Sequence, residues 1–181
     1  MVIIDGRKRA SSDLIEPGKY EICFYYITDE LWWHAEPYNV LERVLDEISS
    51  SASYNVLYDI RRTDVNPQTV KAFCDNYKIS LLPALVITPE DIVEGLRVRK
   101  IEASEVIPKE ILWNLCRIGK EEKLKNFFVE MLQLNKKGEL NLGRRNFWEN
   151  IRRIGLRIFE ESWEKVVTPV IAEYLRRLSI G

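Results

Sequence analysis

The sequence has only one histidine, His34, and three cysteines, Cys23, Cys74 and Cys116, among 181 residues. The cysteines lie far apart, so the chain has no CxxC redox pair. Their odd number and wide spacing exclude a four-cysteine zinc site and the dense disulfide framework of small secreted proteins. A single histidine also argues against a histidine-rich metal site. We therefore expect neither a bound metal nor another cofactor.

No part of the sequence has the length and apolarity of a membrane span, which needs about 18 apolar residues in a row. The N-terminal segment becomes charged after four residues and lacks the apolar run of a secretory signal peptide. The chain has 27 basic and 28 acidic residues, so its net charge gives no general reason to expect binding to nucleic acid or to a membrane. We expect a soluble, cytoplasmic protein.

Hydrophobic residues make up 46% of the chain and charged residues 30%, a composition that supports one sizeable core. The charge is unevenly distributed. Residues 1–119 carry 14 basic and 19 acidic side chains, whereas residues 120–181 carry 13 and 9. An acidic first part joined to a basic second part favours contact between the two parts or with a charged partner. Many arginines, isoleucines and glutamates with only two glutamines also suggest a thermophilic source.

Runs of β-branched and aromatic residues predict strands. Residues 20–28 suit a strand that is buried on both faces, and residues 55–60 are expected to form the second strand. Residues 82–87 are expected to form the third, with a proline at its entrance, where a missing hydrogen-bond donor is tolerated. Residues 96–101 alternate apolar and basic side chains, which predicts a half-exposed fourth strand antiparallel to the third.

Apolar residues spaced three or four positions apart predict amphipathic helices. Two of them, at residues 37–50 and 66–77, alternate with the first three strands, and each has a proline in its first turn. From residue 108 onwards the pattern is entirely helical, with apolar stripes at residues 111–118, 124–132, 147–158 and 168–178. The predicted order is therefore β-α-β-α-β-β followed by helices.

Three segments resemble landmarks of the thioredoxin superfamily in order and spacing. The segment HAEPY at residues 34–38 stands where that family has its WCGPC motif, one to two helical turns before LDEI at residues 45–48. The segment DVNPQT at residues 64–69 resembles the D-x-N-P-x-T segment that follows the second strand. The segment YKISLLP at residues 77–83 is similar to the Y-x-I-x-x-I-P segment that ends in the family's cis-proline.

The resemblance covers roughly residues 20–117 and implies an α/β fold, a thioredoxin-like three-layer domain with a central mixed β-sheet flanked by helices. We accordingly divide the chain into an N-terminal segment at residues 1–19, a thioredoxin-like domain at residues 20–118 and an all-helical C-terminal extension at residues 119–181. The extension would cover one face of the sheet or form a homodimer interface. The resemblance also implies that the Leu82–Pro83 peptide bond is cis.

The chain departs from the family at the redox motif. Ala35 and Tyr38 occupy the two cysteine positions, so there is no thiolate to attack a disulfide and no second thiol to resolve the mixed disulfide. This excludes dithiol chemistry. Cys23 and Cys116 fall in apolar patterns and are expected to be inert core residues. Asp29 matches the family's buried acid only by ungapped counting.

In thioredoxins the redox motif and the cis-proline border a groove that holds an extended substrate segment. The resemblance implies that the corresponding groove consists of Trp32, Trp33, His34, Ala35, Glu36, Pro37, Tyr38, Leu82 and Pro83. Adjacent tryptophans would supply the contact area of a binding hot spot, and the backbone of Leu82 would pair with a partner chain by strand addition. The alternative is that both tryptophans pack into the core or against the C-terminal helices.

Two further candidate sites depend on charge. His34 is a candidate general base, although only Glu36 stands near it in the sequence as a carboxylate partner. A basic patch on the last helices would bind phosphate or an acidic partner. The patch consists of Arg144, Arg145, Arg152, Arg153, Arg157, Arg176 and Arg177. Pairs at helical spacing, such as Glu149 with Arg152 or Arg153, also explain these arginines as a solvated face.

The sequence predicts a redox-inactive thioredoxin-fold module that binds another protein as an adaptor or chaperone. One alternative is an enzyme that resembles glutathione transferases, with a short helical domain. In that enzyme Leu82-Pro83 and the segment at residues 102–104 would hold glutathione, and Tyr25, Tyr26 or Thr28 would be the activating hydroxyl. A second alternative is binding of nucleic acid or another anionic partner through the arginine-bearing helices, which the near-zero net charge disfavours.

Overall fold

A mixed β-sheet forms the centre of the protein in the computed structural model, which describes residues 3–4, 7–8 and 20–180. Its strands are β1 (Ile3–Ile4), β2 (Arg7–Lys8), β3 (Ile22–Thr28), β4 (Val56–Arg62), β5 (Ala84–Thr88) and β8 (Glu105–Ile107). They lie side by side in the order β1-β2-β4-β3-β5-β8. β3 is parallel to β4 and antiparallel to β5, and β8 is antiparallel to β5. Apart from β1 and β2, the predicted N-terminal segment lies outside the described residues.

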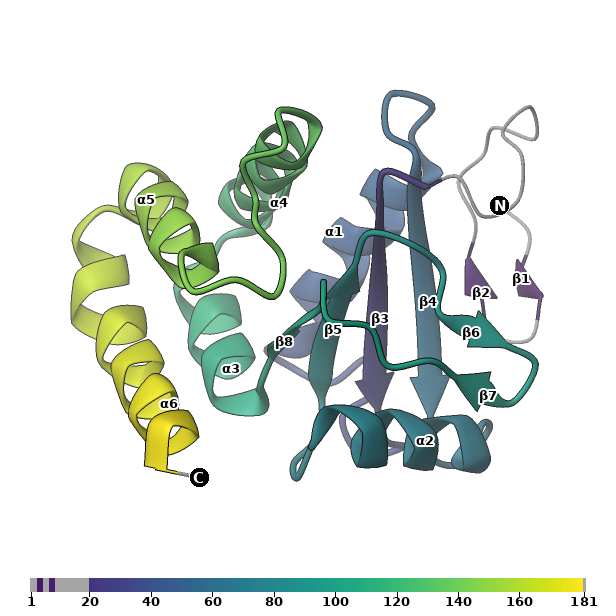
Figure 1. Ribbon diagram of the computed structural model, residues 1–181. Coiled ribbons are helices and arrows are strands. Elements are labelled where there is room, and N and C mark those ends of the chain that lie inside the picture. Colours follow the sequence, from purple (N-terminus) through teal and green to yellow (C-terminus); the bar gives the residue numbers. More distant parts are fainter. Residues whose placement is uncertain (1–2, 5–6, 9–19, 181) are drawn as a thin grey trace.

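Helices flank the sheet on two sides (Figure 1). Their bounds are α1 (Tyr38–Ser50), α2 (Pro67–Tyr77), α3 (Lys109–Ile118), α4 (Glu121–Lys136), α5 (Phe147–Phe159), the π-helix η1 (Trp163–Val167) and α6 (Thr168–Ile180). In the view of Figure 1, α2 lies in front of the sheet and α1 lies behind it, while α3 to α6 form a helical group beside them. The protein is therefore a mixed α/β structure.

The side chains of β3 alternate between two apolar clusters. Phe24 and Tyr26 pack into the larger cluster, which includes residues of α1 and of the helices α3 to α6. Cys23 and Tyr25 point to the other face, where the smaller cluster includes residues of α2. All seven residues of β3 are buried, which confirms the prediction of a strand covered on both faces.

The helices after Ile118 share the core of the sheet. Phe24 of β3 and Phe128 of α4 meet edge to face, with ring centroids 5.6 Å apart. Within the helical group, the indole of Trp163 lies against Gly155 of α5, where any larger side chain would overlap it. The structure has a helix at each of the four predicted stretches, residues 111–118, 124–132, 147–158 and 168–178.

The prediction of a fourth strand at residues 96–101 is wrong. Only Arg97–Val98 (β7) is a strand there, and it pairs with β6 (Val93–Glu94) in a separate two-stranded sheet. The amide of Asn76 and the hydroxyl of Tyr77, both on α2, donate to the carbonyl oxygens of Val98 and Arg99. These bonds hold the segment on α2, so β8 instead takes the place beside β5.

The expectation that the whole basic patch lies on the last helices is wrong for Arg144 and Arg145. α5 begins at Phe147, and the two arginines belong to the turn before it. Asn141 and Gly143 in this segment have positive φ angles of 60° and 77°, a backbone conformation that a helix does not adopt.

Candidate functional site

Three loops meet at one edge of the sheet, at the bottom of Figure 1. They are residues 29–37 after β3, residues 63–66 after β4 and residues 78–83 before β5. Because β3 and β4 are parallel and β5 is antiparallel to them, the ends of the first two strands and the start of the third lie together. The register pairs Thr28 with Arg62 and Ile27 with Ala84. The two halves of the predicted groove therefore lie at the same edge.

Trp32 is part of an aromatic cluster between the sheet edge and the helices. Its ring centroid lies 5.5 Å from that of Tyr38 on α1 and 6.1 Å from that of Trp113 on α3. The ammonium group of Lys109 lies 4.5 Å from the Trp32 ring centroid. Trp32 is half-buried, whereas Tyr38 is completely buried. Tyr38 therefore belongs to the core, and Trp32 presents only part of its ring to a ligand.

Trp33 contacts charged and titratable neighbours. Its ring centroid lies 3.9 Å from that of His34, and the guanidinium carbon of Arg62 lies 5.1 Å from the Trp33 ring centroid. Arg62 in turn binds Asp64 through two hydrogen bonds. Trp33 is half-buried and keeps part of its surface exposed.

His34 is paired with a carboxylate that the sequence did not indicate. Its Nδ1 lies 2.9 Å from Oε2 of Glu42, and its backbone N–H donates to Oε1 of the same residue over 3.2 Å. Glu42 is on α1 and its side chain is only 6% exposed, whereas the His34 side chain is 65% exposed. Glu36, the expected partner by sequence distance, is an exposed residue of the loop.

The remaining predicted groove residues differ in exposure. The Leu82–Pro83 peptide bond is cis, as the resemblance implied. Pro83 is buried, and Leu82, Ala35 and Pro37 are half-buried. The predicted groove residues on this edge are therefore mostly apolar and partly buried, and His34 and Glu36 are the exposed ones.

The same edge carries apolar side chains that the sequence analysis missed. Leu31, Val65 and Leu81 are 74%, 58% and 54% exposed, and each comes from a different one of the three loops. We call these three residues the apolar edge. Little in the sequence indicated these residues. Each is a single apolar residue in a loop, outside the periodic apolar pattern of the neighbouring helix or strand. Only the sheet brings the three together.

A pocket continues from the apolar edge toward α6. It has a volume of about 240 Å³, and Leu81, Ala84, Val106, Lys109 and Leu178 are among the residues that line it. Leu178 is 58% exposed. The pocket therefore connects Leu81 of the apolar edge with the last helix.

The predicted basic patch is largely neutralised. Four of its seven arginines form ion pairs with acidic side chains, three of them with acids on other elements. The expected pairing of Arg152 with Glu149 is replaced by pairing with Glu164. The four pairs are Arg152–Glu164, Arg157–Glu130, Arg176–Glu173 and Arg177–Glu110.

The hydroxyl groups proposed for glutathione activation are inside the protein. Tyr25, Tyr26 and Thr28 are completely buried. The hydroxyl of Tyr25 donates to Asp91 over 2.7 Å and accepts from the backbone of Ile92. None of the three reaches the protein surface, where a substrate thiol would approach.

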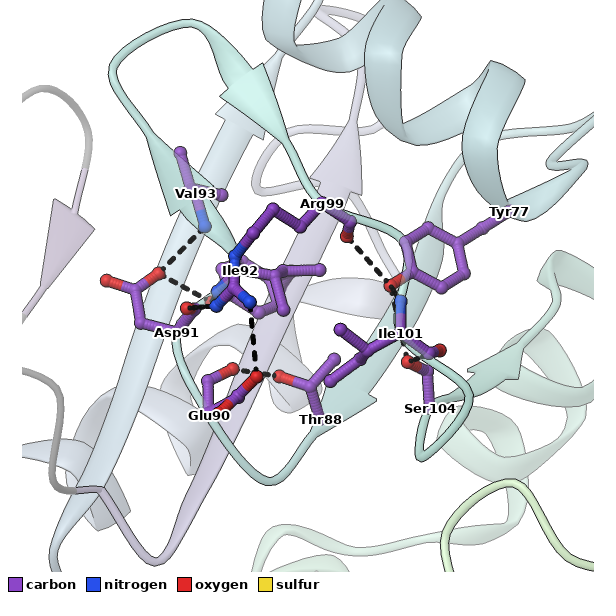
Figure 2. A network of polar contacts seen from close by, with 10 residues as sticks. Tyr77, Thr88, Glu90, Asp91, Ile92, Val93, Arg99, Ile101 and Ser104 are labelled. Atoms are coloured by element: carbon purple, nitrogen blue, oxygen red, sulfur yellow. Dashed lines mark hydrogen bonds and ion pairs between the residues drawn. The ribbon is translucent and has the colours of Figure 1, made fainter.

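Ser104, another residue assigned to glutathione binding, belongs to a partly exposed network of polar contacts within the chain (Figure 2). Its hydroxyl donates to the carbonyl of Ile101 and bonds to the hydroxyl of Tyr77. In the same network the guanidinium of Arg99 bonds to Glu90 and to the carbonyl of Asp91. These bonds fasten the segment that contains β6 and β7 to α2 and the sheet, which is a structural role.

The three thiols are protected by the fold. Cys23 and Cys116 are buried, as expected, and Cys74 is half-buried. Burial raises the pKa of Cys116 to about 12 and also raises the pKa values of Cys23 and Cys74. Each thiol therefore stays protonated at neutral pH, and a protonated thiol is a poor nucleophile.

None of the helices in the described part of the chain combines the length and apolarity needed to cross a membrane. Among the same residues, no group of three or more histidine, cysteine, aspartate or glutamate side chains is placed to hold a metal ion. The sequence matches no protein-family model and no curated protein. The apolar edge and the pairing of His34 with Glu42 are therefore the two features of this end of the molecule that suggest a function.

Proposed function

We propose that this chain is a redox-inactive thioredoxin-fold module that binds an extended segment of another protein along the apolar edge, as an adaptor or chaperone. The fold assignment is supported by the strand order β4-β3-β5-β8 with one parallel pair, and by α1 and α2 on opposite faces of the sheet. Ala35 and Tyr38 stand where the two cysteines of a thioredoxin would be, which supports a role without dithiol chemistry.

The observation that carries the proposal is that Leu31, Val65 and Leu81 are exposed apolar residues in three loops at one edge of the sheet. The strands next to these loops are neighbours about 4.8 Å apart, and we propose that the three side chains form a strip that an extended segment follows. Six large apolar residues are exposed among the described residues, and half of them lie at this edge. Exposed apolar surface that is gathered in one place marks an interaction site. Burying one such side chain completely stabilises a complex by about 1.5–3 kcal/mol.

Cations and aromatic rings flank this strip. Lys109 lies over Trp32 and Arg62 lies over Trp33, so each half-exposed ring has a positive group beside it. Aromatic residues and arginine are enriched where binding energy is concentrated. The apolar edge thus has the polar rim that protein interfaces commonly have.

The alternative functions receive less support. A glutathione-dependent enzyme would need an accessible hydroxyl, but Tyr25, Tyr26 and Thr28 are completely buried. Binding of nucleic acid would need free cationic groups, but Arg152, Arg157 and other arginines of the basic patch are paired with carboxylates. Neither alternative has a structural feature comparable to the apolar edge.

The proposal is tested with the variants Leu31→Ser, Val65→Ser and Leu81→Ser, alone and combined. Binding is measured against an array of short immobilised peptides, with dissociation constants determined for those that bind the native protein. We expect the triple variant to bind at least about tenfold more weakly, which corresponds to about 1.4 kcal/mol. The matched control is Leu96→Ser, because Leu96 is 64% exposed but lies in the turn between β6 and β7.

Native-like melting temperatures must be verified for all variants. If no peptide binds the native protein, or if the triple variant binds as tightly as the control, the proposal is wrong.

A further inference from the structure

His34 and Glu42 form a pair of the kind that orients a catalytic imidazole. Both carboxylate oxygens of Glu42 serve the same residue, one at Nδ1 of the ring and one at the backbone N–H. The ring is thereby fixed relative to its own backbone, which has a positive φ of 61°. The carboxylate is buried and the ring is exposed. A buried acceptor makes a stronger hydrogen bond than one in water, so the orientation is well defined.

The pairing determines which ring nitrogen is basic. A carboxylate that accepts at both oxygens requires the proton to be on Nδ1 of the neutral imidazole. The lone pair is then on Nε2, at the opposite side of the ring. Because the side chain of His34 is 65% exposed, this basic side of the ring is available to a ligand. A general base needs this combination of a fixed tautomer and an accessible nitrogen.

The imidazole borders an open pocket that fits a small ligand. Its volume is about 320 Å³, and it is lined by Trp33, His34, Asn39, Glu42, Arg43 and Asp46. Trp33 offers an apolar, flat surface beside the His34 ring. Asn39 contributes an amide donor. Nε of Arg43 donates to Glu121, which leaves the other N–H groups of its guanidinium to stabilise negative charge on a carbonyl oxygen. The pocket thus combines a base, an apolar wall and hydrogen-bond donors.

We propose that His34 is a general base for the hydrolysis of small activated carboxylic esters with an aryl or apolar group. Nε2 accepts a proton from water as the water oxygen forms a bond to the carbonyl carbon. The carbon–oxygen bond to the leaving group then breaks, and the leaving oxygen takes the proton from Nε2. The products are a carboxylic acid and an alcohol or phenol. Glu42 acts as a positioning residue through Nδ1, and the proposal is independent of peptide binding at the apolar edge.

The test uses p-nitrophenyl acetate and the full-length protein. His34 is the only histidine of the chain, so the imidazole contribution has a single source. We expect hydrolysis at least about tenfold faster than with the same concentration of N-acetylhistidine amide, and a return to background in His34→Asn. Asparagine tolerates a positive φ, so this exposed substitution preserves the loop. Glu30→Gln, which removes an exposed carboxylate of the same loop, is the matched control and should leave the rate unchanged.

The role of Glu42 is tested by measuring which ring nitrogen of His34 carries the proton. Loss of Glu42 would not change this proton position if Glu42 only supported the fold. The ring nitrogen shifts of His34 in nuclear magnetic resonance spectra should report a proton on Nδ1 in the native protein. In Glu42→Gln we expect a larger fraction with the proton on Nε2 and a slower hydrolysis. A native rate equal to that of the free amide, full activity in His34→Asn, or a native proton on Nε2 would each overturn the proposal.

Discussion

Arg61 and Asp59 form a two-hydrogen-bond ion pair inside the protein, on neighbouring inward positions of β4. Nε of Arg61 lies 2.8 Å from Oδ1 of Asp59, and Nη2 lies 3.2 Å from Oδ2. The two side chains are 3% and 0% exposed. They point to the same face because they are two residues apart on a strand, and this is the face that α2 covers. Each charge is buried with its partner. Removing only one of the two charges would therefore lower the stability of the folded protein.

We expect Asp59→Asn to destabilise the protein by about 3–5 kcal/mol, because it leaves the Arg61 charge buried without its counter-ion. The double variant Asp59→Leu/Arg61→Met removes both charges and should be less destabilised than Asp59→Asn. Urea unfolding measures the free energy of unfolding of both variants. The matched control is Asp64→Asn, since Arg62 and Asp64 have the same sequence spacing but are much more exposed. Equal effects of Asp59→Asn and Asp64→Asn would contradict the prediction.

Gly155 is predicted to be intolerant of any side chain. A Cβ atom at this position would lie 2.2 Å from Cδ2 of Trp163, and the indole is almost completely buried. Trp163 also stacks on Phe159, so it has little room to move away. We expect Gly155→Ala to destabilise the protein by about 1–3 kcal/mol, as overpacked cores do.

The check for this second prediction is a double-mutant cycle measured by urea unfolding. Trp163→Leu creates space for the new methyl group of Gly155→Ala. The double variant should therefore be less destabilised than the sum of the two single variants. The prediction is wrong if the changes in unfolding free energy of the two single variants add up in the double variant, or if Gly155→Ala is as stable as the native protein. Either result would show that the contact with Trp163 does not exclude a side chain at residue 155.

Glu105 should make the stability of the protein decrease as the pH rises. Burial raises the pKa of this carboxyl to about 7 from its usual value near 4.5, although Oε1 accepts a hydrogen bond from the backbone of Gly143. Between these two values the folded protein holds a proton that the unfolded chain has released. The contribution of Glu105 to the free energy of unfolding is therefore fully present below pH 4.5, and it is lost as the pH rises toward 7.

Glu105→Gln removes this titration and keeps an oxygen that can accept from Gly143. We expect it to stabilise the protein above pH 7 by about 1–2 kcal/mol, the value being lowered by partial solvent exposure. The variant should also give a flatter curve of unfolding free energy between pH 4.5 and 7. Melting temperatures measured across this range test it, and an unchanged slope in Glu105→Gln would rule out this residue as the source.

Elements with a repeated local pattern could be predicted from the sequence. The buried run that became β3 contains β-branched and aromatic residues on both faces, and all seven of its residues are buried. α2 begins at Pro67 after Asn66, as the sequence indicated, and the four apolar stripes after residue 108 are helical. These predictions are correct because the apolar pattern that indicates each helix or strand lies within that helix or strand.

Predictions that depended on a partner elsewhere in the chain were less accurate. The alternation at residues 96–101 is real, but side chains of Asn76 and Tyr77 bind the backbone carbonyl groups there. The strand beside β5 is therefore Glu105–Ile107. In the same way Arg152 pairs with Glu164 instead of a glutamate on its own helix. Which distant group supplies a hydrogen bond is decided by packing.

The sequence by itself determined that this protein has no CxxC motif, that it contains a strand buried on both faces, and that helices dominate its last third. These properties depend on composition and on short-range periodicity. Only the tertiary structure placed Leu31, Val65 and Leu81 along one edge, because three separate loops become neighbours through the pairing of β4, β3 and β5. It also brought the buried carboxylate of Glu42 on α1 to His34 in the loop before that helix.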